Sequence, residues 1–399
     1  MKPSFKKTLA KMLGGMILFS TCTKSVIITA EPDTSKNSQD ITLTCEAAVL
    51  MEGSTGEVIY SKNETKQLRP ASITKIMTLL LIFEALEEGK ITLTDKVPVS
   101  EHAAGMGGSQ VYLEPYETQD VNTMIKCISI ASANDASVAM AEFLAGSEEA
   151  FVARMNERAK ELGMEHTHFV NCYGLDTDSH YSCALDVAKM SRELIINHPQ
   201  ISNYSTVWMD TFIHTTKKGQ TEFGLTNTNK LIRSYEGITG LKTGSTGLAK
   251  YCLSATARRN DMDLIAVIMA APDTKTRFSE AATLLNYGFA NCSIYRDNAE
   301  GFDFSPISVR GGVKEEVMPT VRDTFSYVCL KGVAPSEISR RFELLKEVKA
   351  PVTKETIIGN IIYERNGAEL GRVALYAKEE IEKAKYLDYL EKLLYEYLY

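Results

Sequence analysis

The chain has 399 residues, which is long for one ordinary domain and sufficient for two. Hydrophobic residues make up 44% and charged residues 24%, a composition that excludes a disordered chain and a polytopic membrane protein. The formal net charge is −7, and no basic tract offers a footprint for nucleic acid. We therefore expect no nucleic-acid partner.

Residues 1–30 predict an export signal. They contain five lysines and no acidic residue, and their apolar run over 12–19 is too short to span a bilayer comfortably. Cleavage is expected after Ala30. A lipoprotein signal ending at Cys22 is the alternative, disfavoured because Thr21 is bulkier than the small residue that such sites prefer. The mature protein is thus expected outside the cytoplasm, at the outer face of the cytoplasmic membrane.

Residues 31–293 are expected to form an α+β domain. A strand pair is predicted over 47–60, around a turn at Gly53–Gly56. The segment Ser72–Glu84 is helical in pattern and apolar on nearly every face, so we expect it at the centre of a core. The further predicted helices are Val121–Ala131, Ala136–Leu144, Glu148–Leu162 and Leu185–Asn197, and the further strands are Tyr251–Arg258 and Asp263–Ala270.

Residues 294–378 predict a small all-β, sandwich-like domain. They consist of short alternating runs, and Asn366-Gly367 between two of these runs is a strong hairpin signal. Residues 379–399 predict an amphipathic helix, with leucines every three or four residues and tyrosines beside them. This helix would either lie in a membrane interface as an anchor or pack on its own domain or on a partner.

The cysteines and histidines do not form a recognisable metal motif. The eight cysteines include no Cys-x-x-Cys pair, and the sequence leaves open whether they form disulfides or are small buried residues. His166 and His168 are too close together for a zinc-protease helix, and no nucleotide-binding glycine pattern occurs. We therefore expect no metal and no organic cofactor.

Three short motifs occur in order: Ser72-Ile73-Thr74-Lys75, Ser132-Ala133-Asn134 and Lys242-Thr243-Gly244. Each alone is weak, because each also fits a helix cap or a strand-to-turn sequence. A serine hydroxyl needs a positioned base, and residues i and i+3 of a helix share a face, so Lys75 can reach Ser72. A lysine becomes a base only when its ammonium is destabilised, here by burial or by Lys242 as a second cation. Free N–H groups at the start of the helix suit a developing oxyanion.

In combination the motifs resemble the low-molecular-mass penicillin-binding proteins that are D-Ala-D-Ala carboxypeptidases. The resemblance covers residues 45–290, and Cys172 stands where the family more often has proline. It implies a penicillin-binding, β-lactamase-like transpeptidase domain, a small second β domain and inhibition by β-lactams. The blocks that carry it are RPASITKIM (69–77), GSQVYL (108–113), SANDA (132–136), FVNCYGLD (169–176), HYSCALD (180–186), TNTNKL (226–231) and GLKTGST (240–246).

The resemblance also implies roles for individual residues. Ser72 would be the nucleophile, Lys75 its base, and Ser132 the relay that protonates the leaving group. The substrate-binding residues would be Asn134 for the peptide backbone, Lys242 for positive potential, Thr243 for the terminal carboxylate, Gly244 on the strand edge, Ser245 for an oxyanion N–H beside that of Ser72, and Arg277 near the carboxylate.

The reaction expected is removal of the terminal D-Ala from peptidoglycan stem pentapeptides. A β-lactamase is less favoured, because no Glu-x-x-Leu-Asn segment lies between Ser132 and Lys242 to supply a deacylating glutamate. A D,D-endopeptidase shares the motifs, but residues 30–290 hold no large insertion, which favours the carboxypeptidase. A catalytically silent wall-binding homologue would have lost the nucleophile or the lysines, and all are present.

Overall fold

The computed structural model describes residues 41–217, 219–330 and 333–398. The export signal predicted over residues 1–30, with its alternative at Cys22, lies outside the described residues. The described residues form two compact units. The first holds residues 41–297 together with the segment Ser326–Glu337, and the second holds Asn298–Phe325 and residues 338–398.

Five antiparallel strands form the main sheet of the first unit, in the order β2-β1-β9-β8-β7. Alternate side chains face opposite sides, so Val49 and Val267 lie in one apolar core and Leu50 and Ala266 in another. The predicted turn at Gly53–Gly56 joins the first two strands, as expected. The strands are β1 (Ala47–Glu52), β2 (Val58–Lys62), β7 (Ile238–Thr246), β8 (Lys250–Arg259) and β9 (Met262–Ala271).

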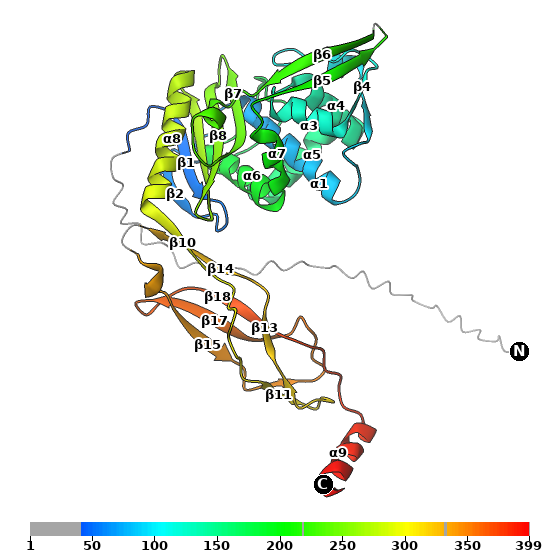
Figure 1. Cartoon of the computed structure of the whole chain (residues 1–399), viewed down its shortest axis with the longest axis vertical. Coiled ribbons are helices and arrows are strands. Elements are labelled where there is room, and N and C mark those ends of the chain that lie inside the picture. The colour runs from blue at the N-terminus through cyan, green and yellow to red at the C-terminus, as the bar shows by residue number, and fades with distance from the viewer. Residues whose placement is uncertain (1–40, 218, 331–332, 399) are drawn as a thin grey trace, which may run out of the picture. The chain divides into compact units, whose positions relative to one another are not determined.

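Helices cover both faces of this sheet (Figure 1). α8 (Thr274–Asn291) packs on one face, where its Leu284 and Leu285 are buried. The other face carries α1 (Lys75–Glu87), surrounded by further helices of the same layer. These are α2 (Glu101–Ala104), α3 (Val121–Ser129), α4 (Asn134–Ala145), α5 (Glu148–Glu161), α6 (Ala184–Asn197) and α7 (Ser202–Ser205), with short 3-10 turns η1 (Ala71–Thr74), η2 (Pro199–Ile201) and η3 (Lys230–Arg233).

The four helices predicted after the first are confirmed, with ends within two residues of those expected. Three of the four begin at a side-chain cap; for example, the Asp120 carboxylate accepts from the Thr123 N–H at 2.7 Å, and the Ser147 hydroxyl accepts from the Ala150 N–H. The predicted helix at Ser72 differs in detail, because its first turn is the 3-10 turn η1 and the α-helix begins at Lys75.

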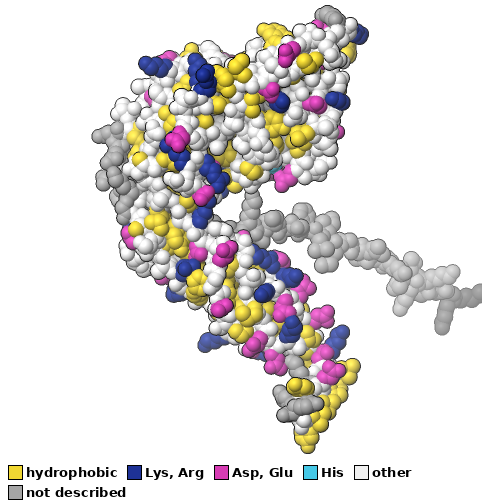
Figure 2. All heavy atoms as spheres, in the orientation of Figure 1, with side chains coloured by type: hydrophobic (Ala, Val, Ile, Leu, Met, Phe, Trp, Pro, Cys, Tyr) yellow, Lys and Arg dark blue, Asp and Glu magenta, His cyan; other side chains and the backbone are white. Residues whose placement is uncertain are grey.

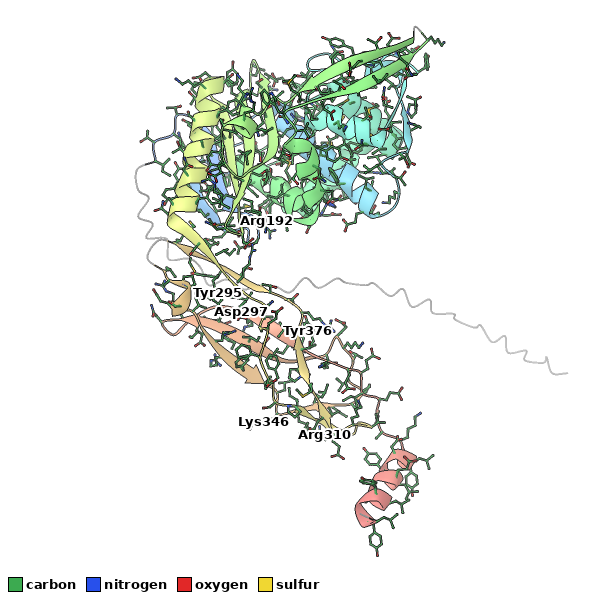
Figure 3. All side chains as sticks on the ribbon, viewed as in Figure 1. Arg192, Tyr295, Asp297, Arg310, Lys346 and Tyr376 are labelled. Atoms are coloured by element: carbon green, nitrogen blue, oxygen red, sulfur yellow. The ribbon has the colours of Figure 1, made fainter. Side chains whose placement is uncertain are left out.

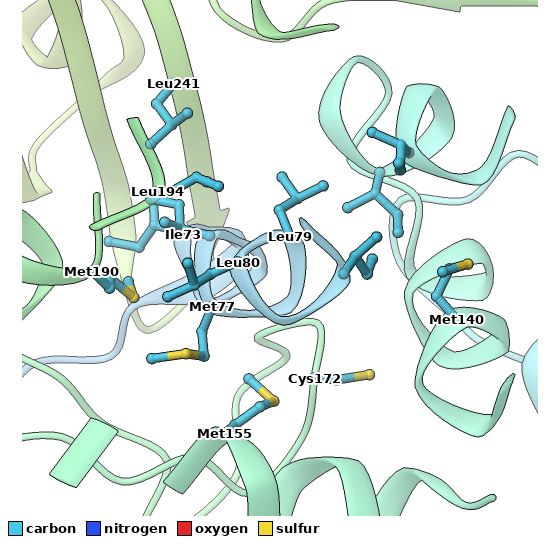
Figure 4. Packing of buried hydrophobic residues seen from close by; sticks show 14 of the residues in the cluster. Ile73, Met77, Leu79, Leu80, Met140, Met155, Cys172, Met190, Leu194 and Leu241 are labelled. Atoms are coloured by element: carbon cyan, nitrogen blue, oxygen red, sulfur yellow. The ribbon is translucent and has the colours of Figure 1, made fainter. Parts of the chain in front are cut away.

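α1 lies at the centre of the apolar core, as its pattern predicted. Its buried side chains include Met77, Leu79 and Leu80, each almost fully removed from solvent. Figure 4 shows these residues among side chains from the helices around them, labelled Met140, Met155, Met190 and Leu194. Dense packing on every side holds the beginning of α1, and therefore the serine just before it, in a fixed position.

Two further antiparallel strand pairs and an arginine contact belong to the first unit. β3 (Lys96–Pro98) pairs with β4 (Thr118–Asp120), and β5 (Met209–Thr216) pairs with β6 (Gly219–Thr226), a hairpin that the sequence did not predict. Arg192 of α6 (Figure 3) donates to the carbonyls of Gly53 at 2.6 Å and Ser54 at 2.8 Å. It thereby ties the helical layer to the β1–β2 turn.

A segment from late in the chain also belongs to the first unit. β10 (Cys292–Asp297) forms a two-stranded sheet with β14 (Phe325–Leu330), and Val328 joins the apolar core beneath α8. The segment 326–337 was predicted as part of the β domain, and its pairing with β10 explains why it groups with the earlier residues. The domain boundary expected after residue 293 stays a prediction.

The second unit is built from β-strands, in agreement with the alternating pattern. One sheet has the order β13-β18-β17-β15 and another the order β12-β11-β16. The hairpin predicted at Asn366-Gly367 joins β17 and β18, and both turn residues have positive φ (52° and 79°). The strands are β11 (Ile307–Arg310), β12 (Glu316–Val317), β13 (Pro319–Val321), β15 (Ser339–Leu344), β16 (Glu347–Lys349), β17 (Ile357–Arg365) and β18 (Ala368–Ala377). The short 3-10 turn η4 (Pro335–Glu337) lies in the segment that groups with the first unit.

The C-terminal helix is shorter than the sequence predicted. α9 runs over Tyr386–Leu398 and does not begin near residue 379. The preceding residues are extended instead, because Ile381 and Lys383 make isolated β-bridges with Val352 and Gly312. Among the described residues, no helix is both long enough and apolar enough to cross a membrane.

Candidate active site

The first motif forms a buried contact at the start of α1. Ser72 lies in η1, where residues three apart are nearly superimposed along the axis, and Lys75 follows it as the first residue of α1. The Lys75 Nζ lies 3.1 Å from the Ser72 Oγ, 2.6 Å from the Asn134 Oδ1 and 2.8 Å from the carbonyl of Tyr173. The first two motifs therefore share one ammonium group.

The environment of Lys75 destabilises its charge. The side chain is fully buried, and burial lowers the pKa of Lys75 to about 7, against smaller electrostatic contributions from Cys172 and Asp135 that raise it. A substantial fraction of Lys75 is therefore neutral near neutral pH. A neutral amine 3.1 Å from a serine hydroxyl can accept its proton.

The second motif lies in the connection between α3 and α4. Ser132 has a positive φ of 63°, and its buried hydroxyl has no hydrogen-bond partner among the described residues. The Asn134 N–H donates to the Ser109 carbonyl at 2.7 Å, and its amide Nδ2 donates to Gly107 at 2.7 Å. An unpartnered hydroxyl beside a firmly held amide is suited to receive a substrate.

Asp135, next to the second motif, fixes a neighbouring loop. Its carboxylate accepts from the N–H groups of Val111 at 3.1 Å and Leu113 at 3.1 Å, and burial raises its pKa. From the sequence alone, Asp135 fits a helix cap. It is a buried acid that holds the loop over residues 107–113 against the second motif.

The third motif brings β7 against the serine. Gly244 has no side chain, and a Cβ at this position would lie 2.8 Å from the Ser72 backbone nitrogen and 2.9 Å from that of Ile73. Only glycine therefore allows the strand to pass this close to the serine turn. Ser245 follows it on the strand and is exposed, so its N–H and that of Ser72 lie on neighbouring segments.

Lys242 and Thr243 occupy the preceding positions of β7. Lys242 is fully buried, and burial, with Lys75 and Arg277 adding to it, holds the pKa of Lys242 well below its ordinary value. Its Nζ donates to the Thr243 carbonyl at 3.2 Å. The Thr243 hydroxyl donates to the Thr228 hydroxyl at 2.6 Å. The second cation expected near Lys75 is thus present, although burial is the main cause of the Lys75 shift.

Arg277 reaches the same strand from α8. One guanidinium nitrogen donates to the carbonyls of Gly244 at 3.1 Å and Cys252 at 3.3 Å, and its buried Nε has no partner among the described residues. The group is therefore a buried cation behind the third motif, between the rings of Tyr251 and Phe278. The structure places it beside the motif but shows no direct contact with Thr243.

Two contacts of the site were not predicted. The Tyr173 carbonyl accepts from Lys75, and Thr228 accepts from Thr243. Both residues lie in sequence blocks that carried the family resemblance, which was the only signal that could have pointed to them. Within the described residues, no three His, Cys, Asp or Glu side chains cluster as metal ligands, and no disulfide joins the seven cysteines there.

The fold agrees with that of solved penicillin-binding proteins. Penicillin binding protein 5 from Haemophilus influenzae is 30% identical with a TM-score of 0.74, over 86% of this chain and 99% of that one. Penicillin binding protein 6B from Escherichia coli is 28% identical with a TM-score of 0.67, over 85% and 96%. The fold and the three assembled motifs define a serine enzyme of the penicillin-binding class.

Sequence comparison gives the family. Residues 33–273 match the peptidase family S11, D-alanyl-D-alanine carboxypeptidase, and residues 289–383 match the C-terminal domain of penicillin-binding protein 5. The chain is 39% identical to D-alanyl-D-alanine carboxypeptidase DacF of Bacillus subtilis, over 98% of each chain, and 32% identical to DacC of Escherichia coli, over 84% of each. The chain belongs to the D-alanyl-D-alanine carboxypeptidase family. The predicted family, fold class and hydrolase activity are confirmed.

Proposed function

We propose that the chain removes the terminal D-Ala from peptidoglycan stem pentapeptides through an acyl-enzyme on Ser72, and that penicillins inhibit it by acylating the same serine. The observation that supports this most directly is the buried Lys75 ammonium, which lies between the Ser72 hydroxyl and the Asn134 amide. A buried lysine whose pKa is lowered to about 7 and which contacts a serine hydroxyl is suited to act as a base.

In the acylation step, Lys75 accepts the hydroxyl proton while the Ser72 Oγ attacks the carbonyl carbon of the penultimate D-Ala. The carbonyl oxygen becomes an oxyanion, which the N–H groups of Ser72 and Ser245 would stabilise. The tetrahedral intermediate collapses when the leaving amine receives a proton relayed through Ser132, whose unpartnered hydroxyl suits this role. Free D-Ala departs, and the acyl group stays on Ser72 as an ester.

In the deacylation step, water attacks the ester carbonyl while Lys75 accepts its proton. The bond to the Ser72 Oγ then breaks, the serine oxygen takes this proton back, and the shortened peptide leaves with a free carboxyl group. The chain lacks the Glu-x-x-Leu-Asn segment of class A β-lactamases between Ser132 and Lys242. We therefore expect the penicilloyl ester to hydrolyse slowly, so that penicillin acts as an inhibitor.

The site also suits a substrate that ends in a carboxylate. Lys242 and Arg277 are buried basic side chains of β7 and α8, and Thr243 presents a hydroxyl on the same strand as Lys242. Arg277, and Lys242 when an anion beside it favours its protonated form, would supply positive potential for the terminal carboxylate of D-Ala, and the Thr243 hydroxyl would donate to it. An internal peptide bond offers no such charge, which supports a carboxypeptidase over an endopeptidase.

One experiment tests the assignment of the nucleophile. The purified chain should form a covalent adduct with a fluorescent penicillin and release D-Ala from a pentapeptide. Ser72→Ala should abolish both, with a loss of at least about 10⁴-fold in rate, while the exposed control Ser234→Ala should match the wild type. A Ser72→Ala protein that still releases D-Ala at a comparable rate would end the proposal.

We also propose that the protein is exported through residues 1–30 and that α9 binds the outer face of the cytoplasmic membrane. Leucines and tyrosines of α9 are exposed, and Figure 2 shows hydrophobic side chains gathered at this helix. An amphipathic helix with exposed tyrosines suits a bilayer interface. Co-sedimentation of the mature chain with lipid vesicles, lost in a Leu390→Glu, Leu394→Glu double variant, would test the anchor.

A further inference from the structure

The β5–β6 hairpin is tied to a segment near the second motif by contacts that the reaction above does not use. The His214 Nδ1 of β5 lies 3.0 Å from both carboxylate oxygens of Glu117. The Gln119 side chain of β4 donates to the Ile213 carbonyl at 2.8 Å. Figure 1 shows the hairpin extending beside β4. These groups are buried or half-buried, so the hairpin is firmly held at this point.

Tyr112 adds an aromatic contact to the same junction. It has a positive φ of 59°, which is unusual for a bulky residue, and its side chain is 65% exposed. Its backbone is fixed on both sides, because the N–H groups of Val111 and Leu113 donate to Asp135. Its ring meets that of Phe223 of β6 edge-on, at 6.0 Å between centroids. Tyr112 thus combines an exposed ring and a positive φ with a ring contact to a segment far away in sequence, and this combination makes it a candidate functional residue.

The contact between Tyr112 and Phe223 connects two segments that are bonded to residues of the second and third motifs. On one side, the loop over residues 107–113 accepts hydrogen bonds from Asn134 through the carbonyls of Gly107 and Ser109. On the other side, β6 leads through Thr226 to Thr228, which accepts from Thr243. The loop is therefore bonded to Asn134, and the hairpin is connected to Thr243 through Thr228. The ring contact links these two segments, each of which reaches a residue expected to bind the substrate.

We infer that Tyr112, held against Phe223, closes the end of the substrate groove beyond Thr243 and restricts the site to substrates with a single residue after the scissile bond. This rests on the proposed function, in which Thr243 binds the terminal carboxylate and the leaving group lies at that end. In a crosslinked stem the leaving group is a whole second peptide, which needs an open exit. Tyr112 is thus a specificity-determining residue that separates trimming of free pentapeptides from cleavage of crosslinks.

The test compares two substrates on the full mature chain: a free pentapeptide and a crosslinked muropeptide dimer. Tyr112→Ala should raise the ratio of kcat/KM for the dimer to kcat/KM for the pentapeptide by about tenfold or more, the size of effect that one pocket contact has on discrimination. Tyr112→Phe keeps the ring and should leave the ratio unchanged. Phe223→Leu should change the ratio in the same direction as Tyr112→Ala.

Tyr116 provides a matched control. It is also exposed and also has a positive φ, but its hydroxyl donates to Glu101 at 2.6 Å. Tyr116→Ala should leave the ratio at the wild-type value, and acylation by penicillin should be normal in every variant.

Two outcomes would overturn the inference alone: an unchanged ratio in Tyr112→Ala, or an equal loss on both substrates, which would show a purely structural role. In both cases the wild type would still trim the pentapeptide, so the proposed function would stand. A wild type that releases no D-Ala would overturn both.

Discussion

The two units differ in the charged side chains that they bury. In the first, Lys75, Lys242 and Asp135 are buried, and neither lysine has a carboxylate partner among the ion pairs of the described residues. In the second, ion pairs such as Lys314–Glu379 and Arg341–Glu364 lie among exposed or half-exposed side chains. Burying a charge without a partner costs several kcal/mol, whereas an exposed pair contributes little either way. Burial shifts the pKa values of these three groups toward their neutral forms, so they do not add stability as charges, and the two lysines are candidates for functional groups.

The largest expected effect concerns the base. Lys75→Ala should lower the second-order rate of acylation by a fluorescent penicillin by about 10³-fold, because it removes the amine that lies 3.1 Å from the Ser72 hydroxyl. Lys66→Ala removes an exposed lysine paired with Glu46 and should leave the rate unchanged. A Lys75→Ala rate within tenfold of the wild type would contradict the contrast drawn between buried and exposed lysines.

The next effect tests the close approach of β7 to the serine turn. Gly244→Ala would place a Cβ 2.8 Å from the Ser72 nitrogen, so the strand or the turn must move. A displacement of this size should lower the acylation rate by about 100-fold. Gly247→Ala, three residues further on, meets no atom within 4 Å and serves as the control. Equal rates in the two variants would show that the packing at Gly244 does not position the nucleophile.

A smaller effect is expected from pH. Burial lowers the pKa of Lys75 to about 7, so the neutral, proton-accepting form becomes more abundant as the pH rises through 7. The acylation rate should therefore increase by about tenfold between pH 6 and pH 8 and level off above. Stopped-flow acylation across this range measures it. A rate that falls over the same interval would mean that the protonated lysine is the active form.

The smallest effect belongs to the second unit. Lys314→Ala should change the free energy of unfolding by less than about 1 kcal/mol, because its partner Glu379 and the lysine itself are both well exposed. Denaturant unfolding of the single variants and the double variant with Glu379→Ala measures the coupling. A coupling free energy of several kcal/mol, or a change in the acylation rate, would contradict the expectation that the exposed ion pairs of the second unit contribute little.

Much of the fold followed from periodicity and turn chemistry. The helix at Glu148 was predicted from its helical pattern, and the hairpin at Asn366-Gly367 from its turn residues. The β5–β6 hairpin was missed because most of its side chains are exposed, so its strands lack an alternating apolar pattern. The start of α9 was placed too early because Ile381 and Ala384 fit helical spacing but are buried in the β unit.

The active site could also be predicted only in part from the sequence. The three motifs carry their chemistry in side chains, and the burial expected for Lys75 followed from the apolar residues around it. The carbonyl of Tyr173 could not be predicted, because every residue has a carbonyl and only the tertiary fold decides which one meets Lys75. The contact between Tyr112 and Phe223 could not be predicted either, because it joins segments that are far apart in sequence.

The pairing of β10 with β14 limits where the chain can be truncated without damage to the first unit. The chain leaves the first unit after Asp297, returns to it at Ser326 and leaves it again after Glu337. A protein shortened at Asp297 would lose the strand that covers the edge of β10, and the core beneath α8 would lose Val328. Exchange of the second unit between relatives should therefore succeed only when the segment Ser326–Glu337 comes from the same parent protein as the rest of the first unit.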